Sequence, residues 1–385
     1  MNLSSQFHYC AILLVILYSF GPLSLSNNPS VTNINKTEMP NHYSLIRPFG
    51  FVTDYNHKTY IPIVFKVYAN PPTPTVSHYI SWDTSGLTCT NFTNMGTAQG
   101  QNMQNGFNGY IILQFWKPAH YGSLFGALTY SGTFVSTDSI QAFIKCYISA
   151  FYSTSPSQVY ISIILGLSNE GSYVDSADGQ AWGNLIEGLD GWIQHDENGQ
   201  NRGDKVAAVG GIDNEISINP ASKSLDWRSG YVYSTDITYI YYGDCTDCPY
   251  IDSSGVFHNT LPSQWGWTLQ QIYTMASGEG SIAMPQIYRR DNKNAYQWDY
   301  LTLTTRVANY YPPMAFAGST TEWDACLEVD NCSSGTSDAI DNTPEMGWES
   351  LYGALNDPVD PRTFQNNIPF STDMSWDQMK VSVTR

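Results

Sequence analysis

The sequence has little charge, and basic residues are its scarcest group. Asp, Glu, Lys and Arg make up 13% of the 385 residues, and 34 acidic residues outnumber 17 basic ones, for a net charge of -17. Such a surface repels the phosphate backbone of nucleic acids and anionic membranes, so neither is expected as a partner. The low charge, combined with 14% aromatic residues, also excludes an intrinsically disordered chain.

Beyond the N-terminus the sequence has no apolar run that could cross a membrane. The one such stretch is 11–20, which has the length of a signal-peptide core, and 24–26 offers small residues for cleavage. We expect a signal peptide over 1–26 and a secreted protein, although the basic residues usual before the core are missing. The alternative is an uncleaved anchor, because 7–25 is almost long enough to span, and the protein would then be a surface-anchored structural protein.

Several cofactor and catalytic motifs are missing. The sequence has no glycine-rich phosphate-binding fingerprint and no G-x-S-x-G elbow, which argues against a serine hydrolase. A single CxxC without a histidine cluster is a weak zinc signal. Asp244 and Asp247 beside it could bind a metal, but such aspartates are more often solvated. We therefore predict no metal site and no cofactor.

Cysteine usage agrees with export. Removal of Cys10 with the signal peptide leaves an even number of cysteines, as expected for disulfides outside the cytoplasm. Two pairs are close enough in sequence to bond locally, and the third pair is what remains. The expected pairs are Cys245–Cys248, Cys326–Cys332 and Cys89–Cys146.

Strand and helix patterns alternate through most of the chain, which is typical of a parallel sheet. Eight strands over roughly 300 residues predict a (β/α)8 TIM-type barrel over 77–385, after a disordered leader (27–40) and a short N-terminal β extension (41–76). The alternative is an open doubly wound sheet. Strands are predicted at 78–83, 110–116, 159–167, 206–212, 238–242, 281–288, 313–318 and 367–376. Helices are predicted at 139–152, 181–193, 225–233, 265–275, 296–307 and 346–355.

Polar and aromatic residues stand where these strands end, and in a barrel such ends converge on one face. The fourth strand is followed by Asp213, Asn214 and Glu215. A pair of carboxyl groups, one protonated and one ionised, is what glycoside hydrolysis requires. The alternative is a loop-capping cluster at a strand end. We expect Asp83, Tyr288, Trp323 and Trp376 to join the site as substrate-binding residues, with Asp83 alternatively an N-cap.

These strand ends resemble those of the large clan of retaining (β/α)8 glycoside hydrolases. The resemblance rests on Asn214-Glu215 after strand four, Tyr288 after strand six and Glu322 after strand seven. It implies that Glu215 is the acid/base, Glu322 the nucleophile and Asn214 the partner of the sugar 2-hydroxyl, with Tyr288 supporting the nucleophile.

The order of segments also resembles secreted bacterial proteins with a glycoside-hydrolase-like barrel. In that group an Asp-x-Glu follows strand four, which implies that Asp213 and Glu215 form the catalytic pair. This chain departs from the group at Gln114, where a conventional Asp stands in strand two. The departure makes a non-catalytic glycan- or surface-binding barrel the rival interpretation. In either case we expect a neutral carbohydrate partner and a monomer. The shared landmarks are Gly166 to Asn169, Ala181-Trp182, Gly211 to Glu215, Tyr242 to Cys245, Pro285 to Tyr288 and Gln297-Trp298.

Overall fold

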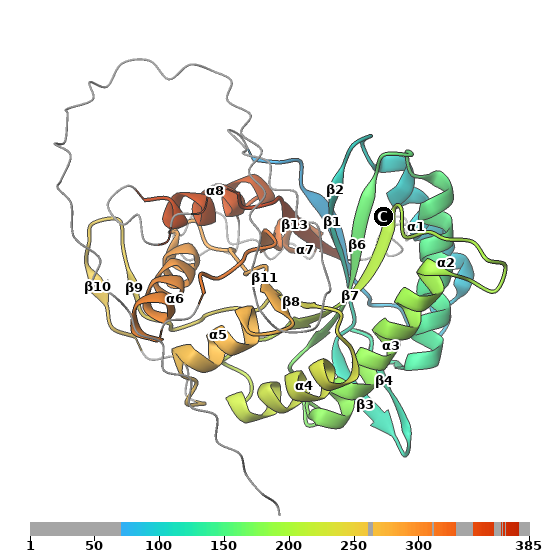
Figure 1. The fold of residues 1–385 in the computed structure, drawn as a ribbon, viewed down its shortest axis with the longest axis horizontal. Coiled ribbons are helices and arrows are strands. Elements are labelled where there is room, and N and C mark those ends of the chain that lie inside the picture. Colours follow the sequence, from blue (N-terminus) through green and yellow to red (C-terminus); the bar gives the residue numbers. More distant parts are fainter. Residues whose placement is uncertain are drawn as a thin grey trace, which may run out of the picture. The chain divides into compact units, whose positions relative to one another are not determined.

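The computed structural model describes residues 71–260, 265–309, 312–328, 342–357 and 367–376, with Thr363 and Gln365 (Figure 1). The predicted signal peptide, the leader and most of the N-terminal β extension lie outside these residues. Among the described residues no helix is both long and apolar enough to cross a membrane.

Eight parallel strands form the main sheet, one for each predicted strand. Their order is β11-β8-β7-β6-β2-β1-β13-β12, so the chain advances in one direction to β11, and β13 pairs with β1. Right-handed crossovers that always advance the same way place all helices on one face. A doubly wound sheet needs a reversal of direction, so this order contradicts that alternative. The strands are β1 (Thr75–Tyr79), β2 (Asn108–Gln114), β6 (Tyr160–Ser168), β7 (Val206–Asp213), β8 (Tyr239–Tyr241), β11 (Ser281–Ala283), β12 (Ser319–Thr321) and β13 (Ser371–Trp376).

The chain segments of the two outermost strands, β11 and β12, approach each other. The backbone N–H of Ala317 donates to the carbonyl of Ala283 at 2.7 Å. Isolated parallel bridges join Ala283 to Phe316 and Gln286 to Thr320, without a continuous ladder. The sheet is therefore curled, as in TIM-like folds, and strand ends that are far apart in sequence lie on one side of it.

The concave side of the curled sheet is filled by one buried hydrophobic cluster to which every strand, or the residues next to it, contributes. Inward-facing side chains of alternate strand residues meet in this way when a parallel sheet closes on itself. A separate and larger cluster lies between the sheet and the helices. The concave cluster consists of Tyr79, Ile112, Ile164, Val209, Ile240, Tyr242, Met284, Ala317, Ala325 and Met374.

Helices cover the convex side, and Figure 1 shows α1, α2 and α3 beside β2, β6 and β7. Their apolar faces follow the helical period: in α2 the buried residues include Ile140, Ile144 and Phe151. Side-chain caps fix the ends of several helices. Thr268 and Gln271 form a capping box, which is why α5 starts later than predicted. The described helices are α1 (Cys89–Asn102), α2 (Thr137–Thr154), α3 (Ser176–Gln194), α4 (Ala221–Ser234), α5 (Leu269–Ser277), α6 (Lys293–Asn309), α7 (Trp323–Glu328) and α8 (Pro344–Leu355).

Helix α1 was not predicted, because its sequence CTNFTNMGTAQGQN is rich in residues of low helix propensity. Packing against α2 stabilises it instead. Gly96 lies so close to α2 that an added Cβ would be 2.2 Å from the carbonyl oxygen of Tyr147. A disulfide between Cys89 and Cys146 joins the two helices, as predicted.

The prediction also missed two short antiparallel units. A small sheet of β3 (Lys117–Tyr121), β4 (Leu124–Leu128) and β5 (Phe134–Ser136) follows β2, and a hairpin of β9 (Tyr250–Ile251) and β10 (Phe257–His258) follows β8. The hairpin comes after the second predicted disulfide, Cys245–Cys248. For the third predicted pair, Cys326 is buried, while Cys332 lies outside the described residues.

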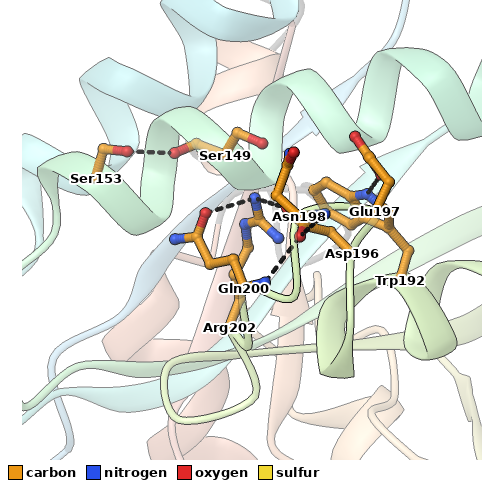
Figure 2. A network of polar contacts seen from close by, with 8 residues as sticks. All are labelled: Ser149, Ser153, Trp192, Asp196, Glu197, Asn198, Gln200 and Arg202. Carbon is orange, nitrogen blue, oxygen red and sulfur yellow. Dashed lines mark hydrogen bonds and ion pairs between the residues drawn. The ribbon is translucent and has the colours of Figure 1, made fainter.

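The loop between α3 and β7 is organised by a buried arginine (Figure 2). Arg202 is 5% exposed, and its Nη2 donates to Asp196 at 2.9 Å and to Gln200 at 3.0 Å. Its guanidinium also lies 4.2 Å from the ring centroid of Trp192. Arg202 is also the first residue of an RGD tripeptide (202–204), and its burial makes it a structural residue.

Candidate functional site

The site is built around the end of β7. Two glycines in this strand let large side chains pack against it: an added Cβ on Gly210 would lie 2.5 Å from the ring of Tyr231, and one on Gly211 would lie 2.7 Å from the ring of Tyr242. The strand is buried along its length and ends at Asp213, which is 9% exposed. The turn after it carries Asn214 and Glu215.

A glutamine that was not predicted as a site residue links the two acids of this turn. Gln286 follows β11, and its Nε2 donates to Oδ1 of Asp213 at 2.7 Å. The same amide donates to the Glu215 carboxylate and lowers the pKa of Glu215. Because one NH2 group serves both acids, Asp213 and Glu215 are held side by side.

Glu322 lies at the end of β12, where two phenols hold it. Tyr79 at the end of β1 donates its hydroxyl to Oε1 of Glu322. Tyr288, which follows β11, also hydrogen-bonds Glu322. Glu322 and Tyr288 are thus brought together as the resemblance implies, while Tyr79 was not predicted.

The acids act on one another electrostatically. Burial raises the pKa of Glu215 to about 7, and the nearby charges of Asp244, Glu322 and Glu170 add to this rise. Burial also raises the pKa of Asp213 well above its ordinary value, with further contributions from Glu215 and Glu322. The pKa of Glu322 is raised by burial as well, but the hydrogen bonds from the two tyrosines lower it in part. Mutual repulsion in a partly dry site favours a state in which some of these carboxyls keep their protons.

Aromatic side chains form the wall beside Glu322. The ring of Tyr79 lies 4.8 Å from Trp376 and 5.0 Å from Tyr130, and Tyr130 lies 5.2 Å from Trp376. Trp116 stacks on Tyr130 at 6.2 Å, and its Nε1 donates to Glu170 at 2.7 Å. Trp116, Tyr130 and Trp376 are half-buried, so their rings are only partly covered by protein.

Asn214 and Asp244 are engaged within the protein. Asn214 is fully buried, accepts from Nδ2 of Asn169 at 3.1 Å and donates to the Tyr241 hydroxyl at 3.2 Å. Asp244 accepts from the backbone N–H of Ile216 at 3.0 Å and so fixes the turn that carries Glu215. The contact between Asn214 and a sugar stays a prediction.

The remaining predicted residues make other contacts. Asp83 is exposed, and its Oδ1 accepts from the Ser85 hydroxyl at 2.6 Å and from the backbone N–H of Ser85 and Gly86 in a turn before α1. Trp323 begins α7, and its backbone N–H donates to Asp373 at 2.8 Å. Trp323 directly follows Glu322 in the sequence, and the contact of either residue with a substrate stays a prediction.

Sequence reasoning did not place Tyr79, Tyr130 or Gln286 in the site. It named Glu170 as a residue at the end of a predicted strand, without a role in catalysis or substrate binding. Tyr130 lies in the turn between β4 and β5, two strands that were not predicted. Within the described residues, no group of three or more His, Cys, Asp and Glu side chains has the arrangement of a metal site.

Comparison of the chain with protein-family models, with curated proteins and with solved structures found no match in any of the three. The function is therefore argued from the site alone.

Proposed function

We propose that the curled sheet is a (β/α)8 barrel and that the protein is a secreted glycoside hydrolase acting on a polysaccharide or cell-wall glycan. One observation carries the proposal: Glu215 and Glu322 both follow the carboxyl ends of parallel strands. Burial raises the pKa of Glu215 to about 7, and two tyrosines hydrogen-bond Glu322. A carboxyl with a raised pKa is suited to donate a proton near neutral pH, and a second carboxylate completes the pair.

In the first step Glu215 gives its proton to the glycosidic oxygen as the bond to the anomeric carbon breaks. Oε2 of Glu322, the oxygen not bonded to Tyr79, attacks that carbon and forms a glycosyl-enzyme ester. In the second step Glu215, now ionised, takes a proton from water, whose oxygen displaces Glu322. Tyr79 and Tyr288 orient Glu322 in both steps, as hydrogen bonds from fixed donors do for a reacting carboxylate.

Asp213 is the second carboxyl partner of Glu215 in this proposal. Burial raises its pKa well above the ordinary value, and the charges of Glu215 and Glu322 add to this rise. Gln286 and Asp244 act as positioning residues, since each bonds to the turn that carries the acid/base. Trp376 and Tyr288 border the sugar. Asn214 stabilises the turn through its hydrogen bonds with Asn169 and Tyr241, and its contact with the sugar 2-hydroxyl is part of the proposal.

Secretion is part of the proposal, with cleavage after Ser26. Two disulfides, Cys89–Cys146 and Cys245–Cys248, are consistent with an extracellular protein, because such bonds persist in oxidising compartments. The signal peptide itself lies outside the described residues.

The test is a screen of aryl α- and β-glycosides of glucose, xylose, mannose, galactose and N-acetylglucosamine, followed by variants on any substrate that is turned over. A general acid contributes about 10²–10⁴-fold where the leaving oxygen must be protonated, as in a sugar–sugar bond. We therefore expect Glu215→Gln to lower kcat/KM for an oligosaccharide of the preferred sugar at least about 100-fold. Glu322→Gly should lose turnover and regain it with azide, giving a glycosyl azide. The matched control is Glu279→Gln, an exposed glutamate that follows α5. Unchanged hydrolysis by Glu215→Gln would refute the proposal.

A second candidate is a barrel that binds glycan without hydrolysing it. Gln114 favours this function, since it is fully buried at the end of β2 and accepts from the Tyr242 hydroxyl, where a carboxylate is conventional. Binding of oligosaccharides with no turnover of any substrate in the screen would favour this candidate.

A further inference from the structure

The small sheet β3-β4-β5 extends directly from the edge of the site. The backbone N–H of Trp116 donates to Leu128 of β4 at 2.8 Å, and its carbonyl accepts from the N–H of Ser168 of β6 at 2.6 Å. Trp116 therefore joins the small sheet to the main one, while its indole donates to Glu170 within the site. In Figure 1 the hairpin of β3 and β4 lies beside α3.

The two faces of this small sheet differ. Alternation along β3 and β4 places Pro118, His120 and Ala127 on one face, which is buried or half-buried and packs toward α2 and α3. The opposite face carries Tyr121, which is 64% exposed, and Phe134 of β5.

On this opposite face an exposed ring and a half-buried ring form a platform. Tyr121 and Phe134 meet edge to face with their centroids 4.7 Å apart, although they come from the two outer strands. Gly126 of β4 pairs with Ala119 of β3 and Ser136 of β5, and it lies so close to β5 that an added Cβ would be 2.0 Å from the carbonyl oxygen of Val135. We define the aromatic platform as Tyr121 and Phe134 together with Lys117, which belongs to the same face.

The platform is continuous with the site. Nζ of Lys117 lies 3.6 Å from the ring centroid of Trp116, and Trp116 stacks on Tyr130 beside Glu322 and Tyr79. A surface of rings and alkyl chain thus runs outward from the carboxyl groups.

We propose that the aromatic platform binds the continuation of a long, uncharged polysaccharide chain whose cleaved bond lies at Glu215 and Glu322. This inference rests on the proposed function and names its substrate as polymeric. Amphipathic rings bind the apolar faces of sugars while hydroxyls stay in water. A stable protein partner would need about 800 Å² per side, more than three side chains offer. An anionic membrane is disfavoured by the net charge of -17.

The test measures binding and turnover separately. Binding is measured in the Glu215→Gln background by pull-down on insoluble cellulose, chitin, xylan, mannan and curdlan, so that hydrolysis cannot remove the ligand. We expect Tyr121→Ala to weaken binding to the preferred polymer about tenfold, which corresponds to about 1.4 kcal/mol. The matched control is Tyr233→Ala, which removes an 81% exposed tyrosine at the end of α4 and should bind as the parent does.

Turnover is then compared on a soluble form of the preferred polymer and on an aryl glycoside. Tyr121→Ala should lower the ratio of polymer to aryl-glycoside kcat/KM about tenfold, mainly through KM for the polymer. Equal binding by the Tyr121 and Tyr233 variants, or no binding to any of the five polymers, would overturn the platform while leaving hydrolysis of small glycosides intact. If the proposed hydrolase function is wrong, the wild-type protein will bind the polymer without hydrolysing it.

Discussion

At the scale of single residues, Gln286 hydrogen-bonds both Asp213 and Glu215 and affects the pKa of Glu215. Its amide donates to Asp213 at 2.7 Å and also to Glu215, and this second bond lowers the pKa of Glu215, which burial has raised to about 7. A general acid works while protonated, so activity should fall as pH rises through that pKa. The falling limb of the wild-type profile of kcat/KM is expected near pH 7.

Replacing Gln286 by Met removes the donor and leaves a side chain of similar length. The pKa of Glu215 should rise, and the falling limb should move to higher pH, which a pH profile of kcat/KM on the preferred aryl glycoside will detect. NMR titration of labelled glutamate gives the same readout without turnover. Gln270→Met, on the exposed face of α5, is the control and should leave the limb in place. A limb that moves to lower pH in the Gln286 variant contradicts the assignment of Glu215 as the acid.

The sequence named Asp213, Glu215 and Glu322, because each stands where an apolar run ends. It did not name Tyr79 or Gln286. Tyr79 belongs to the first strand of the sheet, and its partner Glu322 is 243 residues away, so their bond exists only once β1 and β12 are brought to the same side. Contacts of this kind depend on the curl of the sheet, which no local pattern encodes.

At the scale of elements, the loop between α3 and β7 depends on one buried ion pair. The side chains of Arg202 and Asp196 are 6% and 2% exposed. Arg289 and Asp291 form a similar pair whose side chains are 27% and 26% exposed. Removing one partner of a buried pair leaves an uncompensated charge and costs about 3–5 kcal/mol, and an exposed pair contributes about 0–1 kcal/mol.

We therefore expect Arg202→Ala to lower the free energy of unfolding by more than Arg289→Ala does. Urea unfolding followed by tryptophan fluorescence measures both. Similar losses in the two variants would show that burial of the Arg202 pair has no special role in stability.

The elements themselves were predicted unevenly. Seven of the eight predicted strands overlap strands of the main sheet, since apolar runs between turn residues are a strong signal. The eighth was predicted at 313–318, but β12 occupies Ser319–Thr321, directly after that range. Helix α1 was missed because tertiary packing on α2, rather than its own propensity, stabilises it. The small sheet was missed because β3 contains a proline and β4 a glycine, residues that are unfavourable inside a strand.

At the scale of the whole molecule, the two described disulfides are expected to differ in their effect on stability. The Cys89–Cys146 bond closes a loop with a sequence separation of 57, and Cys245–Cys248 one of 3. The chain-entropy estimate is about 4 kcal/mol for the first and about 2 kcal/mol for the second.

Urea unfolding of Cys89→Ser/Cys146→Ser and of Cys245→Ser/Cys248→Ser, each compared with the wild type, tests this order. The first variant should lose the larger part of the stability. If the short-loop variant loses more, the bond beside Asp244 stabilises the folded turn directly rather than by restricting the unfolded chain.

The buried cluster on the concave side of the main sheet limits where a substrate chain can bind. Val209, Ile240 and Met284 are at most 5% exposed, and they fill the concave side of the curled sheet. The polymer substrate that we propose therefore cannot pass through the sheet and has to lie across the edge formed by the strand ends. In that proposal both products of cleavage leave on the side from which the substrate binds.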